Sequence, residues 1–284
     1  MIRIVEVGPR DGLQSETLTI PTETKVAYID ALSSSGVSEI EASAFVSPKW
    51  IPQLADAEEV FRRIRRAPGV LYSALVPNEQ GLDRALSAKV DKIAVFTAAS
   101  ETFNRKNINA SIEESIRRFV PVIERARKAA LPVRGYVSTA FWCPYEGRIA
   151  PAAAAAVCRR LLEVGVDEVS IGDTIGKAVP DEVRQLLGEI LPAIPATGLA
   201  MHFHDTYHHA VENVLASWKM GIEAFDSSAG GIGGCPYAPG ASGNVATEAV
   251  VDALRAAGAD VRADVGALAE ARRVILPVLG RRSA

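Results

Sequence analysis

Two histidines separated by one residue are the strongest chemical signal in the chain. His202 and His204 lie in the run Leu199-Ala-Met-His-Phe-His-Asp205. If this apolar run forms a strand, side-chain alternation directs both imidazoles to one face. Paired imidazoles on one face are typical of metal sites, and the alternative is a pair of core histidines hydrogen-bonded to neighbouring strands.

A carboxylate and a guanidinium follow the first strand-like run of the chain. They are Asp11 and Arg10, in the segment Glu6-Val-Gly-Pro-Arg-Asp-Gly12. Asp11 could bind the same ion as the histidines, together with the carbonyl of Asn244. Such oxygen ligands beside two imidazoles suit magnesium or manganese at least as well as zinc. Arg10 could then stabilise an enolate oxygen, whereas the alternative for this Arg-Asp pair is a salt bridge at the rim.

Two further carboxylates lie at or near the ends of strand-like runs. Glu41 precedes Ala42-Ser-Ala44, where an unpaired buried carboxylate would be costly, so it needs a metal, Arg10 or a water. Asp173, in Ile171-Gly-Asp-Thr174, could serve the site or could cap the turn that follows. Both carboxylates are therefore candidates.

A glycine-rich segment carries one of the three cysteines. Residues 227–244 include Cys235 between several glycines, which permit unusual dihedral angles. The spacings of GxGxxG and Walker loops are absent, so we expect a lid that brings Cys235 to the site as a proton donor or nucleophile. Cys158 is expected to be a buried apolar residue on a helix, and Cys143 to lie on a loop near the site.

Short apolar runs alternate along the chain with stretches of helical periodicity. The expected strands are residues 2–7, 38–42, 70–75, 92–96, 133–137, 168–171, 199–204 and 222–226. The expected helices include residues 23–32, 57–66, 112–130, 151–163, 181–190 and 210–220. Eight such repeats without a Pro- or Ser-rich linker predict an α/β fold, a (β/α)8 TIM barrel with its active site at the C-terminal mouth, rather than an open doubly wound sheet.

Composition limits the classes of partner. The chain has 284 residues, is 48% hydrophobic and carries a net charge of −3 with no long Lys/Arg run. We therefore expect a small-molecule substrate and neither nucleic acid nor a membrane. The first strand-like run starts at residue 2 and leaves no room for a signal peptide, so a cytoplasmic location is expected.

The ordered motifs resemble those of the 3-hydroxy-3-methylglutaryl-CoA (HMG-CoA) lyases of the DRE-TIM metallolyase superfamily, over nearly the full length. The resemblance rests on Val5-Glu-Val-Gly-Pro-Arg-Asp-Gly-Leu-Gln14, Phe45-Val-Ser-Pro-Lys-Trp50, Lys106-Asn-Ile-Asn109, Ser111-Ile-Glu-Glu-Ser115, Arg134-Gly-Tyr-Val-Ser138, Cys143-Pro-Tyr-Glu-Gly147, Gly172-Asp-Thr-Ile-Gly176, His204-Asp-Thr-Tyr207 and Gly233-Gly-Cys-Pro-Tyr237. It implies a single pyruvate-carboxyltransferase/HMG-CoA-lyase-like domain over residues 1–284.

The resemblance also implies a reaction. HMG-CoA, or a close 3-hydroxy-3-substituted glutaryl-CoA, would be cleaved by a retro-Claisen step to acetyl-CoA and acetoacetate or the matching 3-oxo acid. A divalent cation, Mg²⁺ or Mn²⁺, would bind the substrate's carboxylate and tertiary hydroxyl. Leucine degradation and ketone body metabolism are the expected context, and a homodimer or higher homo-oligomer the expected assembly, since barrels of this family often pair.

Roles for individual residues are likewise implied by the resemblance. The metal ligands would be Asp11, His202, His204 and Asn244. The catalytic residues would be Arg10, Glu41, Asp173, His202 and Cys235. Substrate and CoA would contact Gln14, Arg105, Lys106, Asn107, Tyr136, Ser138 and Ser170. Asp173 or a metal-site residue would be the base, and Cys235 or His202 the donor that protonates the enolate carbon.

Three positions depart from the lyase pattern: Ala44, Trp142 and His208. They leave open a related 3-hydroxy-3-carboxymethyl acyl-CoA as substrate. A Claisen-condensing acyl-CoA synthase of the isopropylmalate or homocitrate type is the alternative function, although such enzymes carry extra C-terminal regions. A non-catalytic protein that binds metal or CoA is the third class, and the presence of Arg10, Asp173 and Cys235 opposes it.

Overall fold

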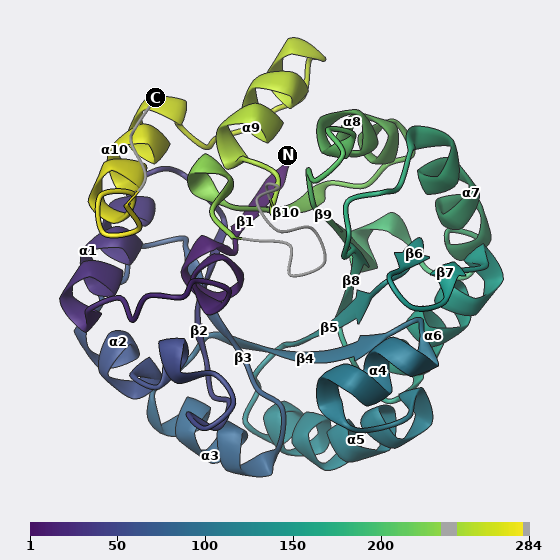
Figure 1. Cartoon of the computed structure of the whole chain (residues 1–284), viewed down its shortest axis with the longest axis horizontal. Helices are drawn as coiled ribbons and strands as arrows, with labels where there is room; N and C mark the ends of the chain where they lie inside the picture. The colour runs from purple at the N-terminus through teal and green to yellow at the C-terminus, as the bar shows by residue number, and fades with distance from the viewer. Residues whose placement is uncertain (234–242, 281–284) are drawn as a thin grey trace.

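Eight parallel strands close into a barrel in the computed structural model, which describes residues 1–233 and 243–280 (Figure 1). The strands are β1 Arg3–Glu6, β2 Glu39–Ala44, β3 Leu71–Leu75, β4 Lys92–Ala98, β5 Val133–Ser138, β8 Glu168–Asp173, β9 Leu199–Phe203 and β10 Ala224–Ser227. Around the barrel their order is β1-β10-β9-β8-β5-β4-β3-β2. The predicted (β/α)8 barrel and all eight predicted strands are confirmed.

Helices form a ring outside the strands (Figure 1). They are α1 Thr22–Leu32, α2 Ala57–Arg63, α3 Glu79–Ser87, α4 Glu101–Ile108, α5 Ile112–Lys128, α6 Pro151–Glu163, α7 Pro180–Ile190, α8 Ala210–Lys219, α9 Thr247–Ala256 and α10 Val265–Ile275. The six predicted helices are present, and α2 ends three residues earlier than expected because the backbone of Ile64 is extended. A short antiparallel hairpin of β6 Trp142–Cys143 and β7 Gly147–Arg148 follows β5.

Local signals explain where several helices begin and end. Ser111 caps α5 through the amide of Glu114, whose carboxylate returns the bond to the Ser111 amide, a capping box. Gly36, Gly165 and Gly221 adopt φ of 76°, 98° and 94° in the turns that follow α1, α6 and α8. Because these dihedral angles are unfavourable for residues with a Cβ, the glycines allow the chain to turn back into the next strand.

Charged side chains occupy the inside of the barrel, where branched apolar residues dominate in most barrels of this kind. Arg134 on β5 pairs with Asp226 on β10 at 2.8 Å and with Glu168 on β8 at 2.9 Å. Lys92 on β4 pairs with Glu168 at 3.0 Å and with Glu39 on β2 at 2.9 Å. These four pairs form an interior ion network that links five of the eight strands. A buried charge is tolerated only when it is paired.

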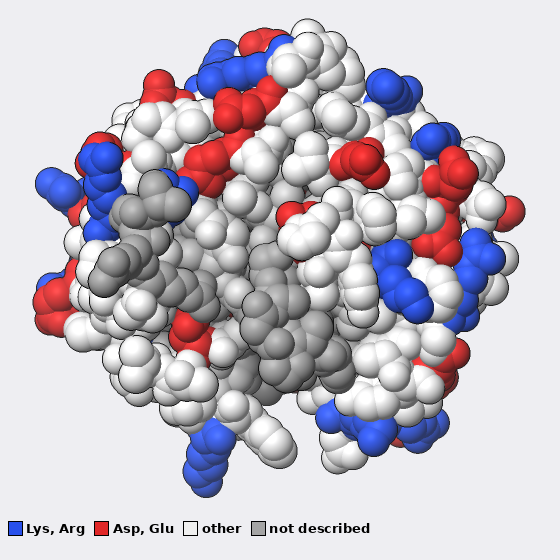
Figure 2. Space-filling view, turned by 45° about the horizontal axis from the view of Figure 1, so that its top comes forward, with Lys and Arg blue, Asp and Glu red and all other residues white. Residues whose placement is uncertain are grey.

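The outer surface mixes both signs of charge. On the face shown in Figure 2, Lys and Arg side chains are interspersed with Asp and Glu. This face lacks a continuous basic area of the kind that binds nucleic acid. Within the part of the chain that the structure describes, no helix is both long and apolar enough to cross a membrane.

Candidate active site

The turn after β1 places Arg10 and Asp11 in the barrel mouth. Residues Gly8–Gly12 form one π-helical turn, in which the amides of Arg10, Asp11 and Gly12 all point at the carbonyl of Val7. Single π turns of this kind are frequent at functional sites. A Cβ on Gly12 would lie 2.9 Å from the carbonyl oxygen of Ile232, so this turn packs closely against the segment that follows β10.

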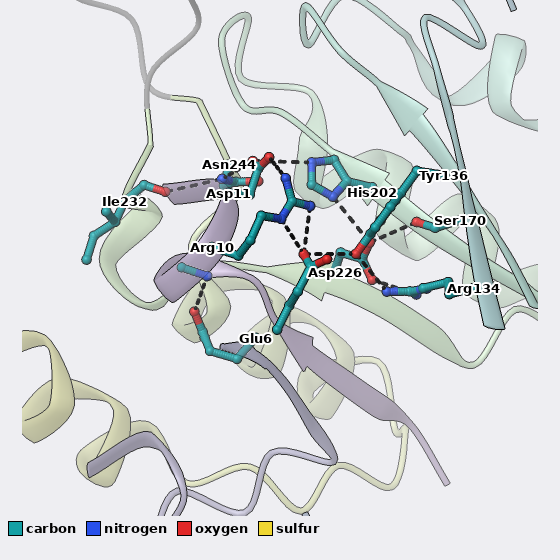
Figure 3. Close-up of polar contacts among 12 residues, drawn as sticks. Glu6, Arg10, Asp11, Arg134, Tyr136, Ser170, His202, Asp226, Ile232 and Asn244 are labelled. Atoms are coloured by element: carbon teal, nitrogen blue, oxygen red, sulfur yellow. Dashed lines mark hydrogen bonds and ion pairs between the residues drawn. The ribbon is translucent and has the colours of Figure 1, made fainter. Parts of the chain in front are cut away.

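Asp11, His202 and His204 come together as a possible metal-binding cluster. One ligand atom from each lies within 4.8 Å of the others, and Asp11 Oδ2 is 4.0 Å from Nε2 of both histidines. Asn244 Nδ2 donates to Asp11 Oδ2 at 2.9 Å and to the Ile232 carbonyl at 3.2 Å (Figure 3). Its Oδ1 is buried without a hydrogen-bond partner among the described residues. The four predicted ligands therefore lie side by side, with one amide oxygen available.

The charge states of Asp11 and His204 also suit a cation. Burial alone would raise the pKa of Asp11, but the Arg10 guanidinium and the two imidazoles outweigh it and hold that pKa below its usual range. Burial and the neighbouring His202 lower the pKa of His204 to about 4. Near neutral pH Asp11 and His204 thus offer an ionised carboxylate and a neutral imidazole, the protonation states that metal binding requires of these two residues.

Arg10 is held in a fixed orientation by carboxylates. Its Nε donates to Glu41 Oε2 at 2.6 Å, and its Nη1 donates to Asp11 Oδ1 at 2.7 Å. The guanidinium lies over the ring of Tyr136, 5.3 Å from the centroid, and the Tyr136 hydroxyl donates to the same Glu41 oxygen at 3.1 Å. Of the three partners expected for Glu41, the structure shows Arg10.

Asp226 contacts the imidazole of His202 on the side away from Asp11, and the sequence alone did not predict this role. Asp226 Oδ2 lies 3.2 Å from His202 Nδ1 and accepts a hydrogen bond from Ser170 Oγ at 2.8 Å (Figure 3). Burial lowers the pKa of His202, but the hydrogen bond to Asp226 and the charge of Asp11 outweigh it and raise that pKa. The only signal in the sequence is that Asp226 ends a predicted strand; its pairing with His202 depends on the neighbouring positions of β9 and β10.

Asp173 ends β8 and is fully buried. Its carboxylate accepts hydrogen bonds from the amides of Lys177 at 3.2 Å and Ala178 at 2.9 Å, which is the turn-capping arrangement considered above. Burial raises its pKa to about 7. Among the described residues no hydrogen bond joins Asp173 to the metal cluster, so its catalytic role stays a prediction.

The predicted substrate and CoA residues occupy three different environments. Gln14 and Ser138 are partly buried, whereas Tyr136 and Ser170 are buried inside the barrel. The remaining three, Arg105, Lys106 and Asn107, are exposed on α4. Lys106 Nζ lies 4.8 Å from the ring centroid of Tyr145 in the β6–β7 hairpin. The exposed residues therefore flank the mouth next to the hairpin.

The cysteines differ in what the structure shows. Cys158 is fully buried on α6, and burial raises the pKa of its thiol to about 12, which confirms the expected apolar role. Cys143 was expected on a loop, but it lies in β6 with 2% of its surface exposed, because its Sγ packs 3.0 Å from Ser100 Oγ at the start of α4. Cys235 lies outside the described residues, so its role in a lid stays a prediction.

A closed parallel barrel with polar and charged groups gathered at its C-terminal mouth defines the class of a TIM-barrel enzyme. The HMGL-like family model matches residues 1–275. The chain is 48% identical over 282 residues to the mitochondrial hydroxymethylglutaryl-CoA lyase of Bos taurus, covering 99% of this chain and 87% of the relative. It is 49% identical over 280 residues to the cytoplasmic 3-hydroxy-3-methylglutaryl-CoA lyase of Mus musculus, covering 99% and 82%.

Solved structures agree with these relatives. The HMG-CoA lyase of Brucella melitensis superposes with a TM-score of 0.96 at 48% identity, covering 98% of this chain and 99% of that one. An Acinetobacter baumannii HMG-CoA lyase in complex with coenzyme A and 3-methylmalate superposes with a TM-score of 0.93 at 37% identity, covering 99% and 92%. The chain therefore belongs to the HMGL-like family, and it is an enzyme of the carbon–carbon lyase class.

Proposed function

We propose that the enzyme cleaves HMG-CoA, or a close 3-hydroxy-3-substituted glutaryl-CoA, to acetyl-CoA and acetoacetate or the matching 3-oxo acid, with the help of a divalent cation. The cluster of Asp11, His202 and His204 beside Arg10 carries the proposal. The cluster supplies ligands for a metal ion, and the Arg10 guanidinium can neutralise the charge of an enolate. The names of the relatives support the choice of substrate.

Asp11, His202, His204 and Asn244 would hold the ion, with Mg²⁺ or Mn²⁺ the expected species. Their fit rests on the ionised carboxylate, the neutral His204 imidazole and the unpartnered Asn244 Oδ1. When bound, a divalent cation supplies a Lewis acid that binds the substrate's carboxylate and lowers the pKa of its tertiary hydroxyl.

Arg10 would stabilise the negative charge that develops on the thioester oxygen. A guanidinium has five N–H donors, and the contacts of Arg10 with Glu41 and Asp11 use three of them. Two donors are left for the substrate. Because Glu41 and Tyr136 already fix the guanidinium, little reorganisation is needed as the enolate forms.

Proton transfers complete the reaction. The substrate's hydroxyl proton passes to a base, the C2–C3 bond breaks, and the electron pair moves onto the thioester as an enolate, which then takes a proton at carbon. Asp173, whose pKa of about 7 suits a base near neutral pH, or a residue of the metal cluster would take the first proton. Cys235 or His202 would donate the second.

An assay against a panel of 3-hydroxy-3-substituted glutaryl-CoA thioesters, with mass detection of acetyl-CoA, tests the proposal. Metal-dependent release of acetyl-CoA is the expected result. Consumption of acetyl-CoA with a 2-oxo acid would instead identify a Claisen-condensing synthase. Metal binding without turnover in either direction would identify a binding protein.

We also propose one domain over residues 1–284, a cytoplasmic location and a homo-oligomer. The family match over residues 1–275 supports the first. The relatives carry both cytoplasmic and mitochondrial names, so fractionation of the source cells decides the second. Light scattering of the purified protein decides the third.

A further inference from the structure

Glu6, at the end of β1, is a buried carboxylate that the proposed mechanism does not use. Among the described residues it forms no ion pair. Instead, Glu6 Oε1 accepts hydrogen bonds from the amides of Gly8 and Ala229, both at 3.0 Å, and Oε2 lies 2.7 Å from the Thr247 hydroxyl. One side chain thus joins the turn after β1 to two segments more than 220 residues further along the chain.

Each of these three segments carries a residue of the candidate active site. Gly8 begins the π-helical turn of Arg10 and Asp11. Ala229 lies three residues before Ile232, whose carbonyl accepts from Asn244. Thr247 begins α9, three residues after Asn244. Glu6 therefore contacts the segments on both sides of the Asp11–Asn244 hydrogen bond, through two backbone amides and the Thr247 hydroxyl, without touching any of the four proposed metal ligands.

The packing around Glu6 leaves little freedom. A Cβ added to Gly8 would lie 2.6 Å from the Tyr28 hydroxyl, 2.7 Å from Glu6 Oε1 and 2.8 Å from Ser228 Oγ. The two later segments are also bonded directly, since the Ser228 amide donates to Val245 and the Thr247 amide donates to Ser228, both at 3.0 Å. These two segments therefore form one unit, which Glu6 joins to the π-helical turn.

We propose that Glu6 is a positioning residue, which fixes the distance between Asp11 and Asn244 by holding the π-helical turn against the 228–233 and 244–247 segments. The inference rests on the proposed function, because this distance matters only if the two residues bind one ion. Metal ligation tolerates errors of only a few tenths of an ångström, so loosening either segment weakens the site.

The test compares variants with matched controls. Glu6→Ala removes all three contacts, and Thr247→Val removes one in case the first variant does not fold. Glu6→Gln keeps a carbonyl for the Gly8 and Ala229 amides and offers Nε2–H to the Thr247 hydroxyl. Asp91→Ala removes a carboxylate that accepts from the Tyr72 amide at the opposite end of the barrel, and so controls for a general loss of stability.

Two readouts separate this inference from the proposed function: Mn²⁺ affinity by calorimetry, and hydrogen–deuterium exchange of residues 8–12 and 244–250. We expect Glu6→Ala to weaken Mn²⁺ binding at least tenfold and Thr247→Val at least threefold, with faster exchange in both segments together. Glu6→Gln and Asp91→Ala should stay within threefold of the wild type.

Unchanged exchange in either segment of Glu6→Ala, or a parallel loss of affinity in Asp91→Ala, would overturn the inference. A wild type that binds no Mn²⁺ would overturn the proposed metal site instead, and the exchange data would still decide whether Glu6 couples the two segments.

Discussion

At the scale of single residues, Arg10 shows how the site combines charge with orientation. Its guanidinium is the point at which Glu41, Tyr136 and Asp11 meet. A lysine at this position would keep the charge but lose the planar fork that makes these contacts at once. A lysine substitution can therefore test the geometry of the Arg10 guanidinium separately from its charge.

We expect Arg10→Lys to lower kcat by about 10²-fold or more, because the ammonium cannot place its donors where negative charge develops on the enolate oxygen. Mn²⁺ affinity should change little, since Asp11 keeps its carboxylate. Steady-state kinetics and a Mn²⁺ titration measure the two effects. A near-normal kcat with a raised KM would make Arg10 a residue that binds the substrate in its ground state.

Asp226 is the second residue whose role can be isolated. Its Oδ2 accepts a hydrogen bond from His202 Nδ1–H, so the Nε2 atom of His202 faces Asp11. Replacing such a supporting carboxylate costs about 10- to 100-fold in metal affinity. We expect Asp226→Asn to weaken Mn²⁺ binding by this amount, and to lower the free energy of unfolding by about 3 kcal/mol because Arg134 loses a buried partner.

Ser170→Ala is the matched control for this prediction, because it removes another hydrogen bond to Asp226 and leaves the charge in place. Its Mn²⁺ affinity should stay within a few-fold of the wild type. Equal losses in the two variants, or none in Asp226→Asn, would contradict an orienting role for the carboxylate.

At the scale of elements, the strands and the longer helices could be predicted because their apolar periodicity is regular. The polar helix α4 could not be predicted, because half of its side chains are exposed and only Phe103 and Asn104 are buried. The β6–β7 hairpin has two residues per strand, too few for alternation to appear. The role of Glu6 could not be predicted either, because its contacts with Ala229 and Thr247 join residues more than 220 positions apart.

The exposed face of α4 carries the next prediction. Arg105 and Lys106 lie on the last turn of this helix, where cations can meet the phosphates of CoA at the barrel mouth. We expect Arg105→Gln with Lys106→Gln to weaken the affinity for a CoA ester about tenfold, as measured by calorimetry, and to leave Mn²⁺ binding unchanged. Arg117→Gln with Lys128→Gln, on α5, removes the same charge elsewhere. Unchanged affinity in the α4 variant would show that CoA binds at another part of the mouth.

At the scale of the whole molecule, the buried acids make stability depend on pH. Burial raises the pKa of Glu6 from 4.5 to about 8, with a small contribution from the nearby Glu248. Between these two values the folded protein keeps a proton that the unfolded chain releases. The free energy of unfolding should therefore fall as pH rises through this window, by at most about 1.4 kcal/mol per pH unit, and level off above it.

Comparison with Glu6→Gln isolates this effect, because glutamine does not titrate and Asp173, whose pKa is raised in the same direction, contributes equally to both proteins. Urea unfolding of the metal-free proteins at pH 5.5, 7 and 8.5 is the measurement. The wild type should lose stability relative to Glu6→Gln as the pH rises. Curves that run parallel would show that Glu6 is ionised throughout.

The interior ion network has a consequence for how the sequence can change. Replacing Arg134, Lys92 or Glu168 alone leaves a buried charge without its partner, which lowers the free energy of unfolding by about 3–5 kcal/mol. Replacing a whole pair with apolar residues of similar volume is often neutral. Substitutions in this part of the barrel are thus mutually conditional. During evolution these residues can change only in coordinated sets on different strands. The ion network therefore restricts which substitutions are tolerated more strongly than its distance from the mouth would suggest.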